Sequence, residues 1–549
     1  MVRLLTSFFL LLVVSVLAAQ HTDIPLNSSV YRLTERLDAK SGVNSFTTVK
    51  PLSRSYLKDK MQSSDFDTSL LDKYDSNYLN LELREESDST LRSSKPIFGR
   101  FFEYPSDVFQ VNIPDFSLHV NPIVVLGAGS EKNQEILFEN YRGIEIRGEI
   151  DGKVGFYTLL TENQARYPSY VQGITDSTLA VPYEGFWKEY KDTGVDFLRA
   201  QAYVGINLTK HITSRFGYGK HFVGDGKRSL ILSDFGNNYP YLRLNTQIWK
   251  IQYTNIFAQL IGDVQGGTFG LLGVGAFTKK YLAFHHLSIQ VHPKLTIGLF
   301  ESVIYGDSTQ GVKASYFNPL IFYKALEQQD GSSDNVILGL DFKWNLFNAT
   351  TWYGQLVIDE LVVKEAFSNS GWWGNKQGFQ LGAKYFDAFG ISNFNLQAEW
   401  NQVRPYVYGH DNNFTSYSHY HQPLAHPIGA NFREVLFSMN YKVIPRLTLF
   451  LDYMNASYGD DEGAINYGRD ILKSYQPDSR PGDYGNDLLQ GNETKVNNVQ
   501  SRFVYELYHN MQLELYHIYR TSESELTSSN TNVAGFTYRW NFPYRSYLF

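Results

Sequence analysis

The feature that most constrains this chain is an alternation of apolar and polar residues that persists from about residue 96 to residue 549. In residues 394–402 every second residue is apolar, and the residues between them are Asn, Gln or Glu. The same period of two recurs in residues 287–292, 434–442 and 446–453. It is typical of strands with one apolar face, so the sequence predicts an all-β fold of successive hairpins.

Alternation alone also fits a soluble sandwich or propeller, and the aromatic residues favour a membrane barrel instead. The chain has 39 Tyr, 38 Phe and 8 Trp, 15% of its residues, yet its mean hydropathy is −0.31. Residues 534–542 form an amphipathic last strand, and Phe549 follows as a terminal aromatic residue. Strands cross lipid only in closed barrels, whose interfaces collect aromatic rings. A soluble all-β fold stays open as the alternative.

The length of the alternating region sets the number of strands. About 24 residues for each strand and its connection gives roughly 16 to 20 strands, with 18 as the central value, for residues 96–549. Residues 458–497 are rich in Gly, Asp and Asn and predict a long outer loop. Asp151 and Gly152 predict a tight hairpin turn between residues 143–150 and 153–160. The fold class is therefore a transmembrane antiparallel β-barrel.

Two other segments precede the barrel. Residues 1–19 carry one charge, Arg3, followed by a short apolar stretch and small residues, which predicts a cleaved signal peptide and export. Residues 20–95 predict a small α-helical periplasmic segment and its linker, with the acidic, Ser-rich residues 85–94 as the linker. Residues 27–29 and Ser53 are candidate helix N-caps.

Composition and missing motifs argue against several functions. The net charge is −7, and −8 without the predicted signal peptide, which disfavours a basic nucleic-acid binder. The chain has no Cys, so thiolate chemistry is excluded. The sequence lacks G-x-S-x-G, H-E-x-x-H, Walker A and EF-hand patterns. We therefore predict no enzyme, no cofactor and no nucleic-acid partner.

Two constellations remain as weaker chemical candidates. His410, His419, His421 and His426 fall within one loop and could bind a transition metal, but a polar loop folded into or over the barrel mouth is the favoured interpretation, and no metal site is predicted. Asp359 and Glu399 lie on polar strand faces and could form a glycosidase pair. A solvated lumen lined with such groups is the favoured interpretation of these carboxylates.

The densest polar segment is residues 216–247, where charged groups alternate with Tyr and Phe. Such a mixture suits stacking on sugars and hydrogen-bonding to them, and it equally suits an internal salt-bridge lattice that stiffens a barrel wall. Together with two loop histidines, this segment supplies the candidate glycan-binding residues: Lys220, His221, Asp225, Arg228, Asp234, Tyr239, Arg243, His419 and His421.

Several motifs resemble the capsule-assembly Wzi family of outer-membrane proteins, most closely its branch of gliding motility proteins called RemB. They are GKHFVGDGKRSLILSD with the PYLRL that follows, HHLSIQVHPKLTIGLFES, YFNPLIFYKALEQQDGSSDNVILGLDF, YGQLVIDEL and HYHQPLAHPIGANFRE. PLNSSVYRLTERLDAKSG with VKPLSR resembles the periplasmic helical segment that opens such proteins. The resemblance implies a barrel of about eighteen strands that holds or organises surface polysaccharide without cutting it.

These observations lead to two hypotheses of function. The first is a non-enzymatic protein in the outer membrane of a Gram-negative bacterium that takes part in attachment or assembly of capsule or exopolysaccharide, and in gliding motility or adhesion. Its partners would be surface polysaccharide, outer-membrane lipid and other motility or secretion proteins. The alternative is a porin-like channel for small solutes.

Overall fold

A computed structural model describes residues 22–63, 71–84, 106–262, 278–306, 311–320, 322–331, 334–366, 368 and 370–549. The predicted signal peptide, the predicted linker at residues 85–94 and the glycine-rich residues 270–275 lie outside the described residues.

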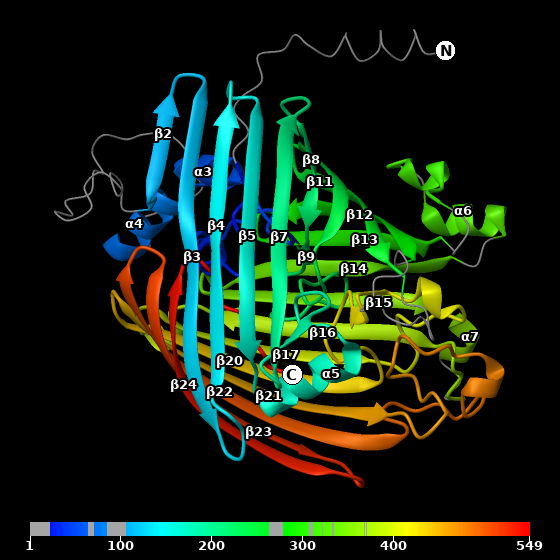
Figure 1. Ribbon diagram of the computed structural model, residues 1–549. Helices are drawn as coiled ribbons and strands as arrows, with labels where there is room; N and C mark the ends of the chain where they lie inside the picture. Colours follow the sequence, from blue (N-terminus) through cyan, green and yellow to red (C-terminus); the bar gives the residue numbers. More distant parts are fainter. Residues whose placement is uncertain are drawn as a thin grey trace.

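Eighteen antiparallel strands close into one barrel, shown in Figure 1, which confirms the predicted fold class and number of strands. The first and last strands of the wall, β3 and β24, pair from Val533 with Glu131 to Trp540 with Val124 and so close the ring. The wall consists of β3 (Phe116–Glu131), β4 (Leu137–Ile150), β5 (Val154–Arg166), β7 (Gly194–Asn207), β8 (Ile212–Gly219), β10 (Tyr239–Ile248), β11 (Ile251–Ile261), β12 (Lys279–His292), β13 (Leu295–Tyr305), β14 (Asn335–Leu346), β15 (Thr350–Glu360), β16 (Lys376–Tyr385), β17 (Phe394–Val403), β20 (Phe432–Ile444), β21 (Leu447–Asp460), β22 (Asn492–Tyr508), β23 (Met511–Glu523) and β24 (Ser528–Trp540).

The alternation separates the two sides of this wall. On β17 the polar side chains of Asn395, Glu399 and Asn401 are buried, whereas Trp400 on the other face is 37% exposed. A soluble sandwich would bury its apolar faces between two sheets; here the barrel is polar inside and apolar outside, as a wall that faces lipid must be. The soluble alternative is therefore wrong.

The two ends of the barrel differ in the length of their connections. At one end, called here the turn end, strands are joined by residues 151–153, 208–211, 249–250, 293–294, 347–349, 386–393, 445–446 and 509–510. Asp151 and Gly152 have φ angles of 54° and 60°, the left-handed pair that a tight hairpin turn requires, which confirms the predicted turn. At the other end, the loop end, the connections reach 31 residues, in residues 461–491.

Short elements complete the connections and the edges of the sheet. They are β2 (Phe109–Ile113), α5 (Ser169–Thr178), β6 (Lys188–Tyr190), η4 (Ala314–Phe317), α6 (Tyr323–Asp330), α7 (Val363–Ala366), η5 (Ala388–Gly390), η6 (Asn413–Thr415), β18 (Ser418–His419), β19 (Gln422–Pro423) and η7 (Pro477–Ser479). Within the described ranges, each helix is too short or too polar to cross a membrane.

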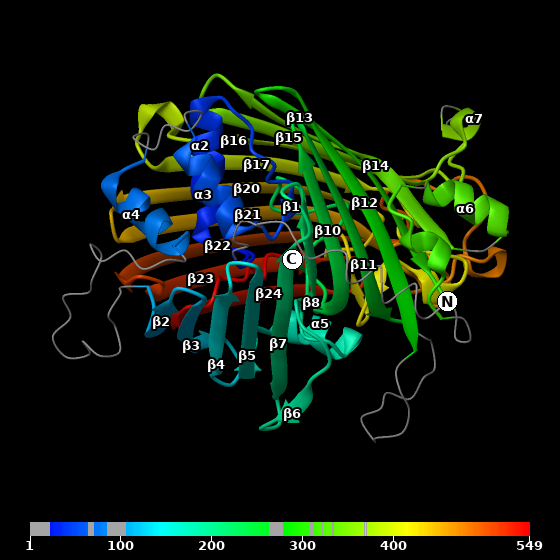
Figure 2. The ribbon, with the colours of Figure 1, turned by 90° about the horizontal axis from the view of Figure 1, so that it is seen from above.

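Residues 22–63 and 71–84 form a helical segment with α2 (Ser29–Ser41), α3 (Arg54–Gln62) and α4 (Lys73–Glu82), drawn in blue in Figure 2. The Ser28 hydroxyl caps α2 by accepting a hydrogen bond from the Val30 amide at 3.3 Å, which confirms one predicted cap. Ser53 is also in the N-cap position, at the start of α3, but its side chain makes no capping bond. The helices share a small apolar core of their own; the division of the chain into this segment and a barrel stays a prediction.

The helical segment is attached to the inside of the barrel at the turn end. Its short strand β1 (Val49–Lys50) pairs with β9 (Phe222–Val223), which lies in the connection between β8 and β10. Arg36 of α2 forms an ion pair at 2.8 Å with Asp387 in the turn between β16 and β17. The Tyr78 hydroxyl of α4 donates to the Asn510 side chain in the turn between β22 and β23. The segment therefore contacts both the wall and a lumenal connection.

The last strand ends earlier than the alternation predicts. β24 stops at Trp540, and residues 541–549, called here the tail segment, leave the wall and run inside the lumen. Asn541 has a φ of 54°, and Pro543 has no N–H to donate to a neighbouring strand. The prediction of a strand through Phe542 followed by an aromatic residue at the end of the wall was therefore wrong: Phe542 and Phe549 are both 6% exposed within the lumenal core.

Candidate functional site

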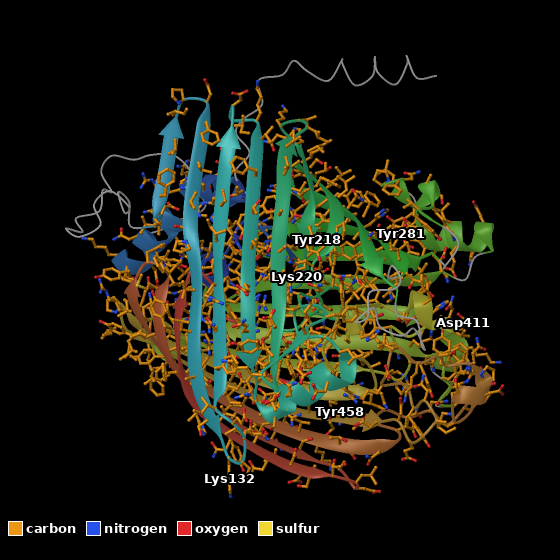
Figure 3. All side chains as sticks on the ribbon, viewed as in Figure 1. Lys132, Tyr218, Lys220, Tyr281, Asp411 and Tyr458 are labelled. Carbon is orange, nitrogen blue, oxygen red and sulfur yellow. The ribbon has the colours of Figure 1, made fainter. Side chains whose placement is uncertain are left out.

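The connection between β8 and β10, residues 220–238, folds into the lumen and carries most of the predicted site residues. Lys220, labelled in Figure 3, donates from Nζ to the carbonyl oxygens of Tyr183 at 2.6 Å, Gly236 at 2.9 Å and Asp234 at 3.1 Å. Its three acceptors match the three donors of an ammonium group, so Lys220 ties two connections together.

Arg228 is the centre of a buried charge cluster. Its guanidinium donates to Glu434 at 2.9 Å and to the carbonyl oxygen of Leu548 in the tail segment. His426 also contacts Glu434, at 2.9 Å, and Glu399 accepts from the backbone amides of residues 227 and 228. The cluster joins the wall, two connections and the tail segment.

The other predicted residues also have partners within the chain. Asp225 accepts from the hydroxyls of Thr47 and Thr48, and Arg243 donates to the Pro51 carbonyl at 2.8 Å. The remaining contacts are His221 with Tyr239 at 3.1 Å, Asp234 with Asn27 at 2.8 Å, His419 with the Ile261 amide at 3.0 Å, and His421 with the Thr178 carbonyl at 2.9 Å.

These contacts are those of an internal lattice, the alternative that the sequence left open beside sugar binding. Seven of the nine predicted residues are buried, and Asp234 and His421 are partly buried. Contact of these nine residues with glycan stays a prediction, since a glycan would have to enter the packed lumen to reach most of them.

The two weaker candidates are dispersed rather than assembled. His410 contacts Thr415 and Asp411, whereas His419, His421 and His426 have the separate partners named above. Across the described parts of the chain, no three His, Cys, Asp or Glu side chains are placed to hold a metal ion. Asp359 pairs with Lys376 at 3.3 Å, while Glu399 accepts from the Arg228 region.

A continuous apolar core fills the lumen on the loop-end side of the helical segment. Leu230, Ile231 and Leu232 from the connection after β8 and Tyr408, Tyr417 and Leu424 from the connection after β17 pack against inward-facing wall residues. Those wall residues come from strands around the ring, among them Val125, Ile256, Ile304, Val357 and Val403. Packed apolar contacts at this level leave little room for a water-filled path.

A hollow of about 450 Å³ lies beyond this core, at the loop end. Four connections and the adjoining strand ends build it, and α6 contributes one edge. Trp373 and Tyr475 form its aromatic floor, with ring centroids 5.0 Å apart. The Arg480 guanidinium lies 4.2 Å from the Trp373 ring and the Lys376 ammonium 4.4 Å from the Tyr475 ring. Cation–π contacts of this kind fix both the rings and the charges.

The rim of the hollow is polar and accessible. The side chains of Asp411 and Glu360 are 46% and 44% exposed, and Gln476 is exposed beside them. Carboxylates, amides and cations around aromatic rings are groups that can hydrogen-bond to sugar hydroxyls and pack against sugar rings. The geometry therefore suits a polyhydroxylated ligand.

Only two residues of this hollow were identified from the sequence, His410 in the histidine loop and Asp359. Trp373, Tyr475 and Arg480 lie in connections about a hundred residues apart, and no motif joins them. The signal that was present is the Trp372-Trp373 pair, two of the chain's 8 Trp in one short connection.

No family model matches the chain, and no curated protein matches it. Among solved structures, the barrel is similar to Wzi of Escherichia coli, described as an outer membrane protein involved in group 1 capsule assembly and a carbohydrate binding beta-barrel. The identity is 12%, the match covers 96% of this chain and 100% of that chain, and the TM-score is 0.55. The chain shares the Wzi fold.

A second match among solved structures is weaker. It is OprD of Pseudomonas aeruginosa, at 10% identity over 77% of this chain and 94% of that chain, with a TM-score of 0.43. The barrel thus resembles bacterial outer-membrane proteins. The comparisons give no support for the gliding motility branch, RemB.

Proposed function

We propose that this protein is a non-enzymatic barrel of the outer membrane of a Gram-negative bacterium that attaches or organises polysaccharide at the cell surface. The loop end would face outward, and the helical segment would lie in the periplasm. The fold shared with a carbohydrate-binding barrel supports this proposal, as does the signal peptide that the sequence predicts.

The observation that favours glycan binding is the hollow at the loop end. Its aromatic floor is held by Arg480 and Lys376, and its rim exposes the Asp411 and Glu360 carboxylates. Because the lumen beneath it is packed, a long polymer would be held across the mouth rather than passed through the barrel. Long polysaccharides suit such a site, since weak contacts on one chain act together through effective concentration.

A role in gliding motility or adhesion extends this proposal. Polysaccharide held at the surface would supply contact with a substrate, and motility or secretion proteins would be further partners of the loop end. A porin-like channel is the competing function, and the packed lumen disfavours it.

Binding to the purified surface polysaccharide of the source bacterium tests the proposal. Trp373→Ala should weaken binding roughly tenfold, because truncating a ring at the centre of a binding site removes more than about 1 kcal/mol. Trp249→Ala is the matched control: Trp249 is 81% exposed, but it lies in the turn between β10 and β11 at the opposite end.

The corresponding cellular test is a deletion strain complemented with each variant. We expect polysaccharide to appear in the medium when the gene is absent or carries Trp373→Ala, and to stay on cells with Trp249→Ala. Full retention in the deletion strain would contradict polysaccharide attachment, and equal binding by both variants would contradict the assignment to this hollow.

A further inference from the structure

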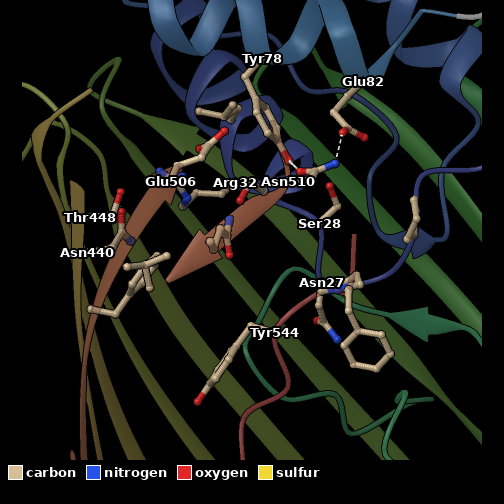
Figure 4. Close-up of a pocket in the computed structure, with 18 of the residues that line it drawn as sticks. Asn27, Ser28, Arg32, Tyr78, Glu82, Asn440, Thr448, Glu506, Asn510 and Tyr544 are labelled. Carbon is tan, nitrogen blue, oxygen red and sulfur yellow. Dashed lines mark hydrogen bonds between the residues drawn. The ribbon is translucent and has the colours of Figure 1, made fainter. Parts of the chain in front are cut away.

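A second cavity, of about 420 Å³, lies at the turn end, on the other side of the lumenal core. Figure 4 shows it between the helical segment, the tail segment and strands of the β20–β23 region. Its rim includes Pro445 and Arg446, which are exposed in the turn between β20 and β21. Its inner end reaches Lys227 and Arg228. The cavity thus opens at the turn end and extends toward the buried charge cluster.

Most charged groups that line this cavity have a partner of opposite charge. Lys442 pairs with Asp75, Lys227 with Asp452, and Arg228 with Glu434. Arg502 lies 3.3 Å from Glu514, and Arg147 lies 3.3 Å from Asp107. These pairs leave little net charge for an incoming ligand.

Arg32 of α2 is different. Its side chain lines the cavity and is half-buried, yet it makes no hydrogen bond or ion pair with any other residue that the structure describes. The carboxylate that influences it most, Asp75, is already held by Lys442 and lies 3.8 Å from Arg36. Glu35, the other acidic neighbour, pairs with Lys384 at 2.7 Å.

A half-buried guanidinium that has no partner in the protein keeps only part of its hydration, and an anion in the cavity would supply the hydrogen bonds and the opposite charge that it lacks. Guanidinium groups bind carboxylate and phosphate through two parallel hydrogen bonds. Burial lowers the pKa of Arg32, but the guanidinium remains protonated at any pH a cell meets. The Arg32 side chain therefore carries its positive charge at every physiological pH.

The rest of the lining consists of groups that bind hydroxyls. Ser28, Asn440 and Thr448 line the same cavity as Arg32, and Glu506 adds a carboxylate acceptor. The Tyr544 ring lines the cavity as well, with the Arg502 guanidinium 3.3 Å from its centroid. A ligand with one anionic group and several hydroxyls would satisfy both parts of this lining.

We propose that the turn-end cavity binds a hydroxylated organic anion, a sugar acid or a sugar phosphate, with the Arg32 guanidinium as the partner of its anionic group. The proposal goes beyond polysaccharide attachment, because the cavity lies at the opposite end of the barrel from the loop-end hollow. The ligand would enter at Pro445 and Arg446.

Calorimetric titration of the full-length, folded protein in detergent micelles tests this site with three probes: galacturonate, galactose 1-phosphate and galactose. We expect at least one of the two anions to bind about tenfold or more tightly than neutral galactose, which is the effect of one charge-assisted hydrogen-bonding group. Which anion binds identifies a carboxylate or a phosphate as the ligand's charged group. Equal affinity for all three probes, or no measurable binding of either anion, would overturn the proposal.

Variants assign the effect to Arg32. Arg32→Gln should lower the affinity for the anion about tenfold or more. Arg433→Gln is the matched control, since Arg433 is exposed and does not line the cavity. Arg32→Lys should lose part of the affinity, because lysine keeps the charge but not the planar pair of donors. If Arg32→Gln binds the anion as well as the unmodified protein does, the assignment is wrong.

Glu506 offers a further discrimination. In the alternative, Arg32 serves only as the counter-charge of Glu506. Neither the unmodified protein nor any variant would then bind the anions. Under the proposal, Glu506→Gln should raise anion affinity, because it removes a competing negative charge from the same cavity. The shift in electrophoretic mobility between heated and unheated samples checks that each variant is folded, and the assay is independent of polysaccharide retention by cells.

Discussion

The lumen of the barrel is closed by different interactions at the turn end and nearer the loop end. At the turn end, the helical segment is attached to the wall through charged pairs, including Lys343 with Asp38 at 2.5 Å and Lys384 with Glu35 at 2.7 Å. Nearer the loop end, connections and the tail segment fill the lumen with an apolar core that lies next to the cluster at Arg228. The first closure depends on matched charges and the second on burial.

This difference teaches that two different kinds of interaction can close the lumen of the same barrel. Charge pairs orient a helical segment against a polar wall but depend on the protonation of their carboxylates. An apolar core depends on packing and is insensitive to pH. Changes at the core should therefore affect overall stability, while acid should act first at the turn end.

The largest expected effect comes from the buried charge cluster at Arg228. Arg228→Ala leaves the fully buried Glu434 with His426 and the Asn401 amide beside it but without its arginine partner, and should lower the free energy of unfolding by about 3–5 kcal/mol. Urea titration in detergent micelles measures this loss. Arg433→Ala, at the exposed neighbouring position, is the control; equal losses in both variants would show that the buried pair is unimportant.

The apolar part of the core should respond to loss of volume. Leu548→Ala removes a side chain that is 0% exposed and packs against Leu436 and Met454, which should cost about 2–5 kcal/mol. Leu526→Ala, at a position 78% exposed in the connection between β23 and β24, should stay within about 0.5 kcal/mol of the unmodified protein. If Leu548→Ala behaves like this control in the same urea titration, the tail segment does not contribute to the core.

Acid should loosen the turn end first. Burial raises the pKa of Glu82, but the hydrogen bond and charge of His509, with the charge of Arg54, outweigh this and lower it to about 2. The folded pKa of Glu82 lies below its ordinary value of 4.5, so the ionised carboxylate stabilises the fold fully above pH 4.5. This stabilisation is lost as the pH falls toward 2, and it amounts to at most about 3 kcal/mol of unfolding free energy.

Hydrogen exchange of the α4 amides, corrected for intrinsic rates, measures this loss between pH 5 and 2. Glu82→Gln should have low protection already at pH 5 and a flatter profile. If Glu82→Gln keeps the full pH dependence, the loss of protection in acid belongs to another group.

The smallest effect is expected at the helix caps. Ser28→Ala removes the side-chain acceptor of the Val30 amide and should destabilise α2 by about 1 kcal/mol. Ser53→Ala, at a cap position without such a bond, should cost less. Hydrogen exchange of the first turns of α2 and α3 compares the two, and equal effects would mean that the Ser28 contact is not a functional cap.

The wall could be predicted from sequence because the residues of each strand alternate between the polar lumen and the apolar outer face. The apolar and polar faces of β17 are evident from ten consecutive residues, and the tight turn at Asp151 and Gly152 from two. The length of the alternating region then gave the number of strands, since each hairpin uses a similar number of residues. The Ser28 cap was equally local.

The interior could not be predicted, because its contacts join distant parts of the chain. Arg228 meets Glu434 and Leu548 at separations of 206 and 320 residues, and Arg243 meets Pro51 at 192. The residue types at 216–247 fit a sugar site and a lattice equally well, and only the partners distinguish them. The alternation also continued past Trp540 to Phe542, although Asn541 turns the chain out of the sheet.

The course of the tail segment constrains the order of assembly. It leaves β24 at the turn end, where Asn541 contacts Asn510 and Pro122, and reaches the α5 region, where Tyr170 contacts Tyr547. The helical segment borders the same cavity at the turn end. Residues 541–549 would therefore have to pass the helices if these docked first. The helical segment, although it comes first in the chain, is thus expected to dock late, after the tail segment has entered the lumen.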